Sequence, residues 1–193
     1  MNATVPEASQ QWKKTKGTYR LWDNESVTAD KQIQYHFETH VRPQLGSRAG
    51  CQRILQISDT VELDYTGKRS DERLGPLSYE HQRGLRLHNS LLLNSLGCPL
   101  GLLRQSYHIR EDEFFGKSRE RVKLPFQEKE SYRWSEHFQA GQELCRRHPG
   151  LEVVYVADRE ADIMELFLER KEPNMHFVIR SRYDRKLADG RQN

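Results

Sequence analysis

The sequence has few of the features that mark membrane-spanning or secreted proteins. Charged residues make up 31% of its 193 residues, and the mean hydropathy is −0.91. Apolar runs such as residues 153–157 are far shorter than the ~20 residues that a membrane-spanning helix needs. The first residues contain neither the basic nor the apolar segment of a secretory signal. We therefore expect a cytoplasmic protein with no membrane segment.

Cysteine is also scarce. Cys51, Cys98 and Cys145 form no C-x-x-C pair, and no histidine lies at the spacing of a zinc site. We interpret the three thiols as reduced and mostly buried. The eight histidines are scattered along the chain, and each is expected to be a surface or packing residue.

Length and charge limit the possible organisation. A chain of 193 residues can form one well-buried core and one smaller flanking piece. The net charge is only +3, but two stretches are basic, residues 12–16 and residues 180–186. From charge alone, phosphate contact and an ordinary solvated face are about equally good interpretations of these stretches.

The first fifty residues predict a helical flanking piece. Residues 1–10 show no apolar periodicity, which predicts a frayed terminus. Thr28 is a suitable N-cap for a helix that ends at Pro43, because apolar residues recur every fourth position after it. Residues 44–50 predict a linker, so the sequence divides into residues 1–50 and a core of residues 51–193 that begins at Cys51.

The core begins with strands. Residues 54–65 alternate between an apolar set and a polar set, which predicts a half-buried strand with its apolar set inside. Asp59 falls within the apolar set, where an ionised carboxylate requires a cation or several hydrogen-bond donors. Residues 87–96 and 101–109 then predict two further strands joined as a hairpin at residues 97–99.

The second half of the core alternates helices and strands. Apolar residues at helical spacing run from Trp134 to Cys145. Residues 153–157 form a continuous apolar run, which is typical of a central strand covered on both faces, and the run ends at Asp158. Residues 163–170 predict a helix and residues 177–179 a last strand. The fold class is therefore α/β, with one mixed sheet flanked by helices.

Asp59 and Asp158 are the residues on which a chemical function would depend. Both lie in or directly after a strand of the same predicted sheet. Carboxylates on adjacent central strands repel each other unless a divalent cation lies between them, and such a pair suits metal-dependent phosphoryl transfer. The alternative is structural: in it, Asp158 caps the helix that follows and Asp59 lies on an exposed bend.

Several motifs together resemble one family. The string Val-Ala-Asp-Arg-Glu-Ala-Asp-Ile at 156–163, followed by Phe-Val-Ile-Arg-Ser-Arg at 177–182, resembles the insertion-sequence-four family of DDE transposases. Shorter matches occur in the same order at 57–60, 83–88, 101–103 and 129–134. The segment from Trp12 to Asn24 is similar to the end of the helical domain with which this family binds transposon ends.

The resemblance implies an RNase H-like catalytic core. Asp59 and Asp158 match the first two catalytic acids, which hold Mg²⁺ or Mn²⁺ in the family. Arg159, Arg180 and Arg182 match basic positions that grip transposon-end DNA, a role that suits guanidinium groups. The alternative for the arginines is salt bridging to Glu160, Glu165 or Asp184, and it is as good as DNA contact for Arg159. Glu160 and Asp162 belong to the motif, but we assign them a structural role at the start of a helix.

The sequence also departs from the family pattern. The third catalytic acid belongs to a tyrosine-arginine-glutamate-lysine signature, and only 35 residues follow Asp158 (193 − 158) without containing it. Tyr107, Arg110 and Glu113 are an approximate match at the wrong place and receive no catalytic weight. We therefore expect an RNase H-like core that is incomplete at the C-terminus and a partial N-terminal helical region.

Three functions remain open at this point. The first is a transposase fragment for metal-dependent DNA cleavage and strand transfer that is inactive alone. The second is a non-catalytic DNA-binding or inhibitory remnant that associates with itself or with a full-length transposase. The third, which the sequence favours least, is an active nuclease that uses Glu160 or Glu165 as a third ligand. All three imply a bacterial, nucleoid-associated protein with DNA as its partner.

Overall fold

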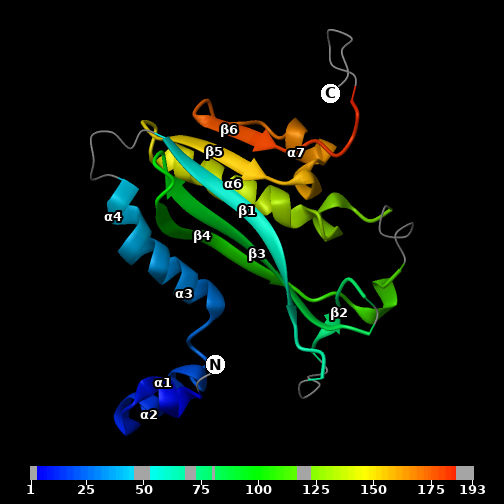
Figure 1. The fold of residues 1–193 in the computed structure, drawn as a ribbon. Helices are drawn as coiled ribbons and strands as arrows, with labels where there is room; N and C mark the ends of the chain where they lie inside the picture. The colour runs from blue at the N-terminus through cyan, green and yellow to red at the C-terminus, as the bar shows by residue number, and fades with distance from the viewer. Residues whose placement is uncertain (1–3, 46–52, 68–72, 80, 117–122, 186–193) are drawn as a thin grey trace.

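The computed structural model describes residues 4–45, 53–67, 73–79, 81–116 and 123–185. These residues form a mixed sheet of six strands flanked by helices (Figure 1). The strands are β1 (Arg53–Asp64), β2 (Gly75–Pro76), β3 (Arg83–Asn94), β4 (Pro99–His108), β5 (Glu152–Ala157) and β6 (Met175–Ile179). Their order is β2–β3–β1–β5–β6, and β4 also pairs with β3. This confirms the predicted α/β class and is consistent with an RNase H-like core.

The helices are shorter and more numerous than the sequence predicts. They are α1 (Val5–Ser9), α2 (Trp12–Trp22), α3 (Ala29–His36), the π-helical η1 (Phe37–Val41), α4 (Arg42–Leu45), α6 (Tyr132–Arg147) and α7 (Met164–Leu168). The described residues also contain the 3₁₀ turns η2 (Asp112–Phe114), η3 (Phe126–Glu128) and η4 (Arg159–Ala161). No helix within the described part of the chain is long and apolar enough to cross a membrane.

Two predictions for the N-terminal region were wrong. Residues 5–9 are helical because Thr4 and Glu7 cap each other in a capping box. Thr28 caps α3 as predicted, but the helical path continues through η1 and α4 to Leu45. Pro43 lies in α4 directly after the π-helical η1, so it stands within this continuous path and has no backbone N–H to donate. Residues 46–50 of the expected linker and Cys51 lie outside the described residues.

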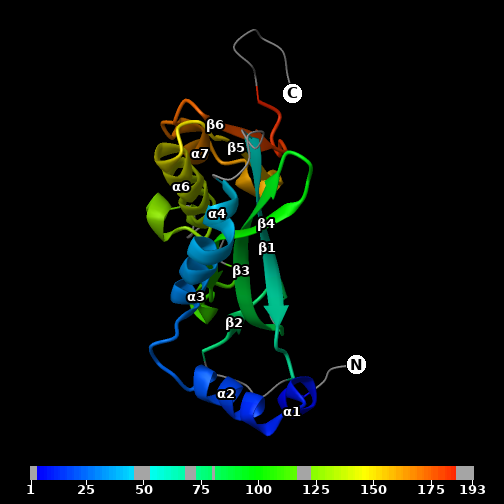
Figure 2. The same cartoon turned by 90° about the vertical axis from the view of Figure 1, so that its left-hand side faces the viewer.

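The π-helical segment η1 and α3 lie against β4 (Figure 1). Gly101 makes the close approach possible: its φ is +137°, and a Cβ atom there would come within 2.6 Å of the His36 and Val41 side chains. The Leu102 backbone N–H donates to His36 Nε2 over 3.2 Å. The contact fixes α3 to the sheet, whereas α1 and α2 lie beyond its end (Figures 1 and 2).

Strand β1 exists where it was predicted, but its two faces are reversed. Ile54, Gln56 and Ser58 are buried, whereas Ile57 and Val61 are 36% and 43% exposed. Asp59 is therefore exposed rather than buried. The mainly polar set of side chains faces the core because partners on β3 and α6 hydrogen-bond Gln56 Nε2 and Ser58 Oγ, which lowers the cost of burying them. Gln56 Oε1 has no hydrogen-bond partner among the described residues.

A buried hydrogen-bond network joins β1, β3, β4 and α6. Gln56 Nε2 donates to Ser90 Oγ over 3.1 Å and to the His137 carbonyl over 2.7 Å. Ser58 Oγ lies 2.6 Å from Ser90 Oγ. The His137 ring lies between two hydroxyls, with Nδ1 2.8 Å from Ser90 Oγ and Nε2 2.9 Å from Ser106 Oγ. The network seats α6 on the sheet beside an apolar cluster that includes Trp134, Phe138, Tyr155 and Met175.

Only one face of the sheet is covered by helices among the described residues. In Figure 2, α3, α4 and α6 lie on one side of β1 and β3, and no helix lies on the other. Burial alternates along β5 accordingly, with Val154 and Val156 half-buried. The expectation that β5 is covered on both faces was therefore wrong. Its central place in the sheet, between β1 and β6, is confirmed.

The remaining elements agree with the sequence in kind but not in extent. Helix α6, the hairpin of β3 and β4, and strand β6 are all present. The predicted helix at 163–170 is reduced to the short α7, and the 3₁₀ turn η4 precedes it. Of the cysteines, Cys145 is buried as expected, Cys98 is exposed, and both are free thiols.

The two buried histidines make stability depend on pH. His88 is 2% exposed and His137 is fully buried, and their rings are 4.3 Å apart. Burial, aided by the charge of Arg133, lowers the pKa of His88 to about 3. Burial, aided by His88 and two arginines, lowers the pKa of His137 to about 2. In the unfolded chain, each ring takes up a proton below its ordinary pKa of about 6.5.

We expect the free energy of unfolding to be highest above pH 6.5 and to fall by about 1.4 kcal/mol per pH unit for each histidine between about 6.5 and 3. Urea unfolding from pH 7.5 to 5 measures this slope. His88→Phe should reduce the slope by about half, and His176→Gln, at an exposed position, should leave it unchanged. An unfolding midpoint that does not vary over this pH range would contradict the prediction.

Candidate functional site

The structure brings Asp59 and Asp158 together. Strands β1 and β5 are parallel neighbours, and the last pair in their register is Ser58 with Ala157. Asp59 is the next residue of β1, and Asp158 is the residue directly after β5. Neighbouring strands lie ~4.8 Å apart. The two acids, 99 positions apart in the sequence, thus occupy adjacent positions at the carboxyl edge of the sheet.

Both carboxylates are exposed at the edge of the uncovered face. Asp59 shares that face with Ile57 and Val61, since side chains alternate along a strand. Asp158 directly follows the buried Ala157 and is itself exposed. The positions therefore favour a shared approach to a ligand from one side of the sheet.

Each carboxylate makes one local hydrogen bond. Asp59 Oδ1 accepts from the Thr60 N–H, and Asp158 Oδ1 accepts from the Glu160 N–H, both over 2.8 Å. The structural alternative for Asp158 is thus realised, because it caps η4. Within the described ranges, neither acid has a basic ion-pair partner, and neither Oδ2 atom has a hydrogen-bond donor. Capping one oxygen leaves the other available to a cation.

The donor set fits a magnesium or manganese ion. Mg²⁺ is held by one or two carboxylates and completes its octahedron with water and substrate phosphate. Asp59 and Asp158 supply two such carboxylates. Among the residues that the structure describes, no group of three histidine, cysteine, aspartate or glutamate side chains could hold a metal. The two acids therefore suit an ion that completes its shell with other ligands.

The three predicted arginines surround the same edge. Arg159 belongs to η4, which begins directly after Asp158. Arg180 follows β6, and its N–H donates to the Ala157 carbonyl over 3.2 Å. Arg182 lies two residues further on, with its guanidinium 5.5 Å from the centre of the Tyr183 ring. All three are exposed.

The salt bridges proposed as the alternative for these arginines are not formed among the described residues. Glu160 pairs instead with Arg133 at 2.9 Å, and Glu165 pairs with Lys129 at 3.6 Å. Arg159, Arg180 and Arg182 have no carboxylate partner within the part of the chain that is described. Their charges are therefore available to an anion outside the protein.

Asp162 holds the segment that carries Arg182. Its buried carboxylate accepts the backbone N–H groups of Arg182 over 2.6 Å and Tyr183 over 3.1 Å, and it pairs with the Arg185 guanidinium. Burial would raise the pKa of Asp162, but these donors lower it below its ordinary value. The predicted structural role is correct, although Asp162 follows a 3₁₀ turn and acts through the chain at 182–185 rather than through a helix dipole.

An ion-pair cluster behind the site was not predicted from the sequence. Glu130 accepts from Arg86 at 2.5 Å and from Arg110 at 2.7 Å. Burial would raise the pKa of Glu130, but Arg110 and Arg86 lower it to about 2. Arg133 lies in the same region and contacts Thr60 and Glu160. No spacing rule indicates this cluster, because its members come from β3, the chain after β4, and the start of α6.

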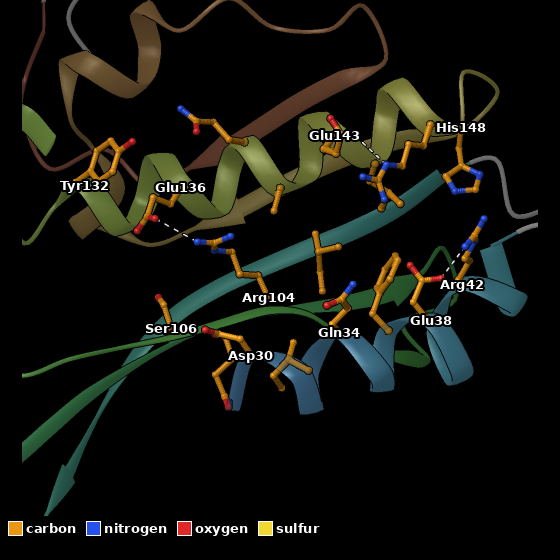
Figure 3. Close-up of a pocket in the computed structure, with 18 residues that line it drawn as sticks. Asp30, Gln34, Glu38, Arg42, Arg104, Ser106, Tyr132, Glu136, Glu143 and His148 are labelled. Atoms are coloured by element: carbon orange, nitrogen blue, oxygen red, sulfur yellow. Dashed lines mark hydrogen bonds and ion pairs between the residues drawn. The ribbon is translucent and has the colours of Figure 1, made fainter. Parts of the chain in front are cut away.

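A hollow lies away from the two acids, between α3 and α6 over β4 (Figure 3). Its volume is about 1010 Å³. Six of the charged side chains that line it form pairs: Arg42 with Glu38, Arg104 with Glu136, and Arg147 with Glu143. None of the predicted site residues lines it. The hollow therefore offers no charge pattern that matches the two acids and the free arginines.

The N-terminal helices carry a second basic surface. Helix α2 contains three lysines and an arginine, together with exposed aromatic side chains at Trp12, Tyr19 and Trp22. Residues 1–27, which include α1 and α2, match the family model described as Transposase DNA-binding. The match supports a transposase-related DNA-binding role for this segment.

Proposed function

We propose that this protein binds transposon-end DNA and holds Mg²⁺ or Mn²⁺ at the DNA backbone with Asp59 and Asp158. One observation carries the proposal: the two carboxylates lie side by side, one residue beyond the last β1–β5 pair, beside arginines with no described ion-pair partner. The match of residues 1–27 supplies independent support for DNA as the partner. We infer residues 1–50 as the DNA-end-binding region and residues 51–193 as the core.

The two acids, the arginines and helix α2 would each have a separate role. Asp59 and Asp158 would each supply carboxylate oxygen to the metal, and the bound metal would polarise a phosphodiester and an attacking water or 3′-hydroxyl. Arg159, Arg180 and Arg182 would contact phosphate oxygens on either side. Helix α2 would position the DNA through its lysines, independently of the reacting bond.

Two acids alone favour binding over turnover. Two-metal phosphoryl transfer requires ligands for both ions, and no third acid joins Asp59 and Asp158 among the described residues. We infer a metal-dependent strand-cleaving and strand-transferring core of the transposase type that has little activity alone. The second candidate, a non-catalytic DNA-binding protein that associates with itself or with a complete transposase, is favoured by the match of the N-terminal segment.

Metal binding and nicking of supercoiled DNA test the proposal together. We expect the protein to bind Mn²⁺, measured by the loss of the free-ion electron paramagnetic resonance signal, and Asp59→Asn or Asp158→Asn to weaken binding at least tenfold. Each substitution removes one of two anionic ligands. Nicking should be weak and should disappear in Asp158→Asn.

Asp184→Asn is the control, since this exposed acid is not a proposed ligand. DNA binding without any Mn²⁺ affinity would reject the metal site and favour the non-catalytic candidate. Strong nicking that depends on Asp158 would instead reveal a self-sufficient nuclease.

The arginines beside the acids should contribute to the salt dependence of DNA binding. Neutralising one phosphate contact changes the slope of log K against log [salt] by about 0.9 for duplex DNA. We expect Arg180→Gln with Arg182→Gln to weaken binding and to reduce the slope by about 1.8. Fluorescence anisotropy between 50 and 250 mM salt measures both quantities.

The matched control removes two charges from the far end of α6. Arg146→Gln with Arg147→Gln changes the net charge equally, but both side chains already pair with Glu143. An equal effect from both double variants would indicate a response to net charge only and would count against specific contacts.

Asp162 should determine whether Arg182 is presented correctly. Asp162→Ala leaves two backbone N–H groups and the Arg185 guanidinium without their acceptor, which should cost about 2–3 kcal/mol of unfolding free energy. Hydrogen exchange should accelerate at the amides of Arg182 and Tyr183, and DNA affinity should fall. Unchanged exchange at these two amides would show that Asp162 does not hold the segment.

A further inference from the structure

The pairing between β1 and β5 ends directly before the two acids. The register between the strands ends at Ser58 and Ala157. Beyond it, β1 continues as far as Asp64 beside β3 alone, while the chain after β5 turns into η4. The paired register of the two strands therefore ends directly before Asp59 and Asp158.

One side chain spans this gap from behind the sheet. Arg133, near the start of α6, donates from Nε to Thr60 Oγ1 over 3.1 Å and from Nη2 to Glu160 Oε2 over 2.9 Å. Thr60 is the residue after Asp59, and Glu160 is the second residue after Asp158. The same guanidinium therefore holds both chain segments that carry the acids.

The guanidinium is itself held in place. The Arg133 side chain is 14% exposed, and it donates from Nη1 to the Glu130 carbonyl. Its Cζ lies 5.7 Å from the centre of the Trp134 ring, and Trp134 is buried in the core. Thr60 is also fixed from its other side, since its Oγ1 lies 2.8 Å from His88 Nδ1. A planar guanidinium group with five donors, held in this way, restricts the movement of the two segments relative to each other.

We propose that Arg133 is a positioning residue that sets the separation of Asp59 and Asp158 for metal binding. The inference rests on the proposed function, because it assigns a role toward the same pair of acids. Arg133 touches neither carboxylate and acts through Thr60 and Glu160. Residues that position metal ligands without touching the metal fix the orientation of those ligands. Their loss commonly weakens metal affinity 10- to 100-fold.

A purely structural role would give a different result. Arg133 is part of a buried polar cluster, so its replacement is expected to lower thermal stability whatever its function. A structural role would leave metal affinity unchanged at temperatures where the variant is fully folded. The distinguishing measurement is therefore the Mn²⁺ dissociation constant at 10 °C, with the thermal unfolding curve of each variant recorded in parallel.

The variants distinguish the hydrogen-bonding geometry of the Arg133 guanidinium group from its positive charge. Arg133→Lys keeps one positive charge but cannot reach Thr60, Glu160 and the Glu130 carbonyl together. Thr60→Val removes the hydroxyl at nearly constant volume, and Thr60→Ser restores it. Arg147→Lys is the matched control on the same helix, because Arg147 is exposed and pairs only with Glu143 in the described chain.

We expect Arg133→Lys and Thr60→Val each to raise the Mn²⁺ dissociation constant about 10- to 100-fold. Thr60→Ser and Arg147→Lys should stay within about twofold of the original protein. Because Arg133 and Thr60 act through one contact, the double variant should lose less than the product of the two single effects.

Each outcome bears on the inference in a separate way. Mn²⁺ binding that depends on Asp59 and Asp158 but is unaffected by Arg133→Lys would overturn the positioning role and leave the proposed function standing. Absence of Mn²⁺ binding in the original protein would overturn the metal site, and the positioning role with it. Loss in Thr60→Val that Thr60→Ser does not restore would also overturn the role of the Arg133 contact.

Discussion

The contact between the polar face of β1 and helix α6 decides where everything else lies. Gln56 and Ser58 enter the core because Ser90 and His137 provide hydrogen bonds for them. Once these side chains are inside, alternation along the strand turns Asp59 outward. The same contact holds α6 against the sheet, which places Arg133 behind the strand ends. A polar interaction in the core therefore fixes both the exposed acids and the group that braces them.

Parallel pairing of β1 with β5 supplies the second constraint. Parallel strands carry their carboxyl ends to the same edge of a sheet, so two acids that each terminate or leave the paired segment are brought together however far apart they are in sequence. Strand β6 extends the parallel sheet by one position, and its end carries Arg180 to the same edge. The site is thus a consequence of strand order, and its residues need no loop of their own to meet.

The sequence predicted β1, β3, β4, β5 and β6 in their order but missed β2 and α1. It also singled out the two acids that the pairing of β1 with β5 brings to adjacent positions. The alternation at 54–65 located β1, and the apolar run at 153–157 located β5 and its end at Asp158. The same alternation predicted the wrong face of β1 to be buried. The number of apolar side chains alone favoured the face that carries Leu55, Ile57 and Val61. What overrides that count is the set of partners for Gln56 and Ser58, which come from positions 30 to 80 residues later. No local pattern contains this information.

The ion-pair network was hidden for a related reason, since pairing depends on tertiary proximity and not on spacing. Net charge gave little guidance at +3, because it counts paired and unpaired arginines alike. The structure separates the two kinds. Arg86, Arg110 and Arg133 form ion pairs with Glu62, Glu130 and Glu160.

Arg159, Arg180 and Arg182 have no such carboxylate within the described residues, and they lie at the edge that carries Asp59 and Asp158. Water screens the repulsion within the exposed acidic pair and among the arginines, so the arrangement costs little free energy. This arrangement of charges is selective for a ligand that supplies a cation for the acids and an anion for the arginines at once. We propose a metal ion bound to a phosphodiester as this ligand, because it supplies both charges at once.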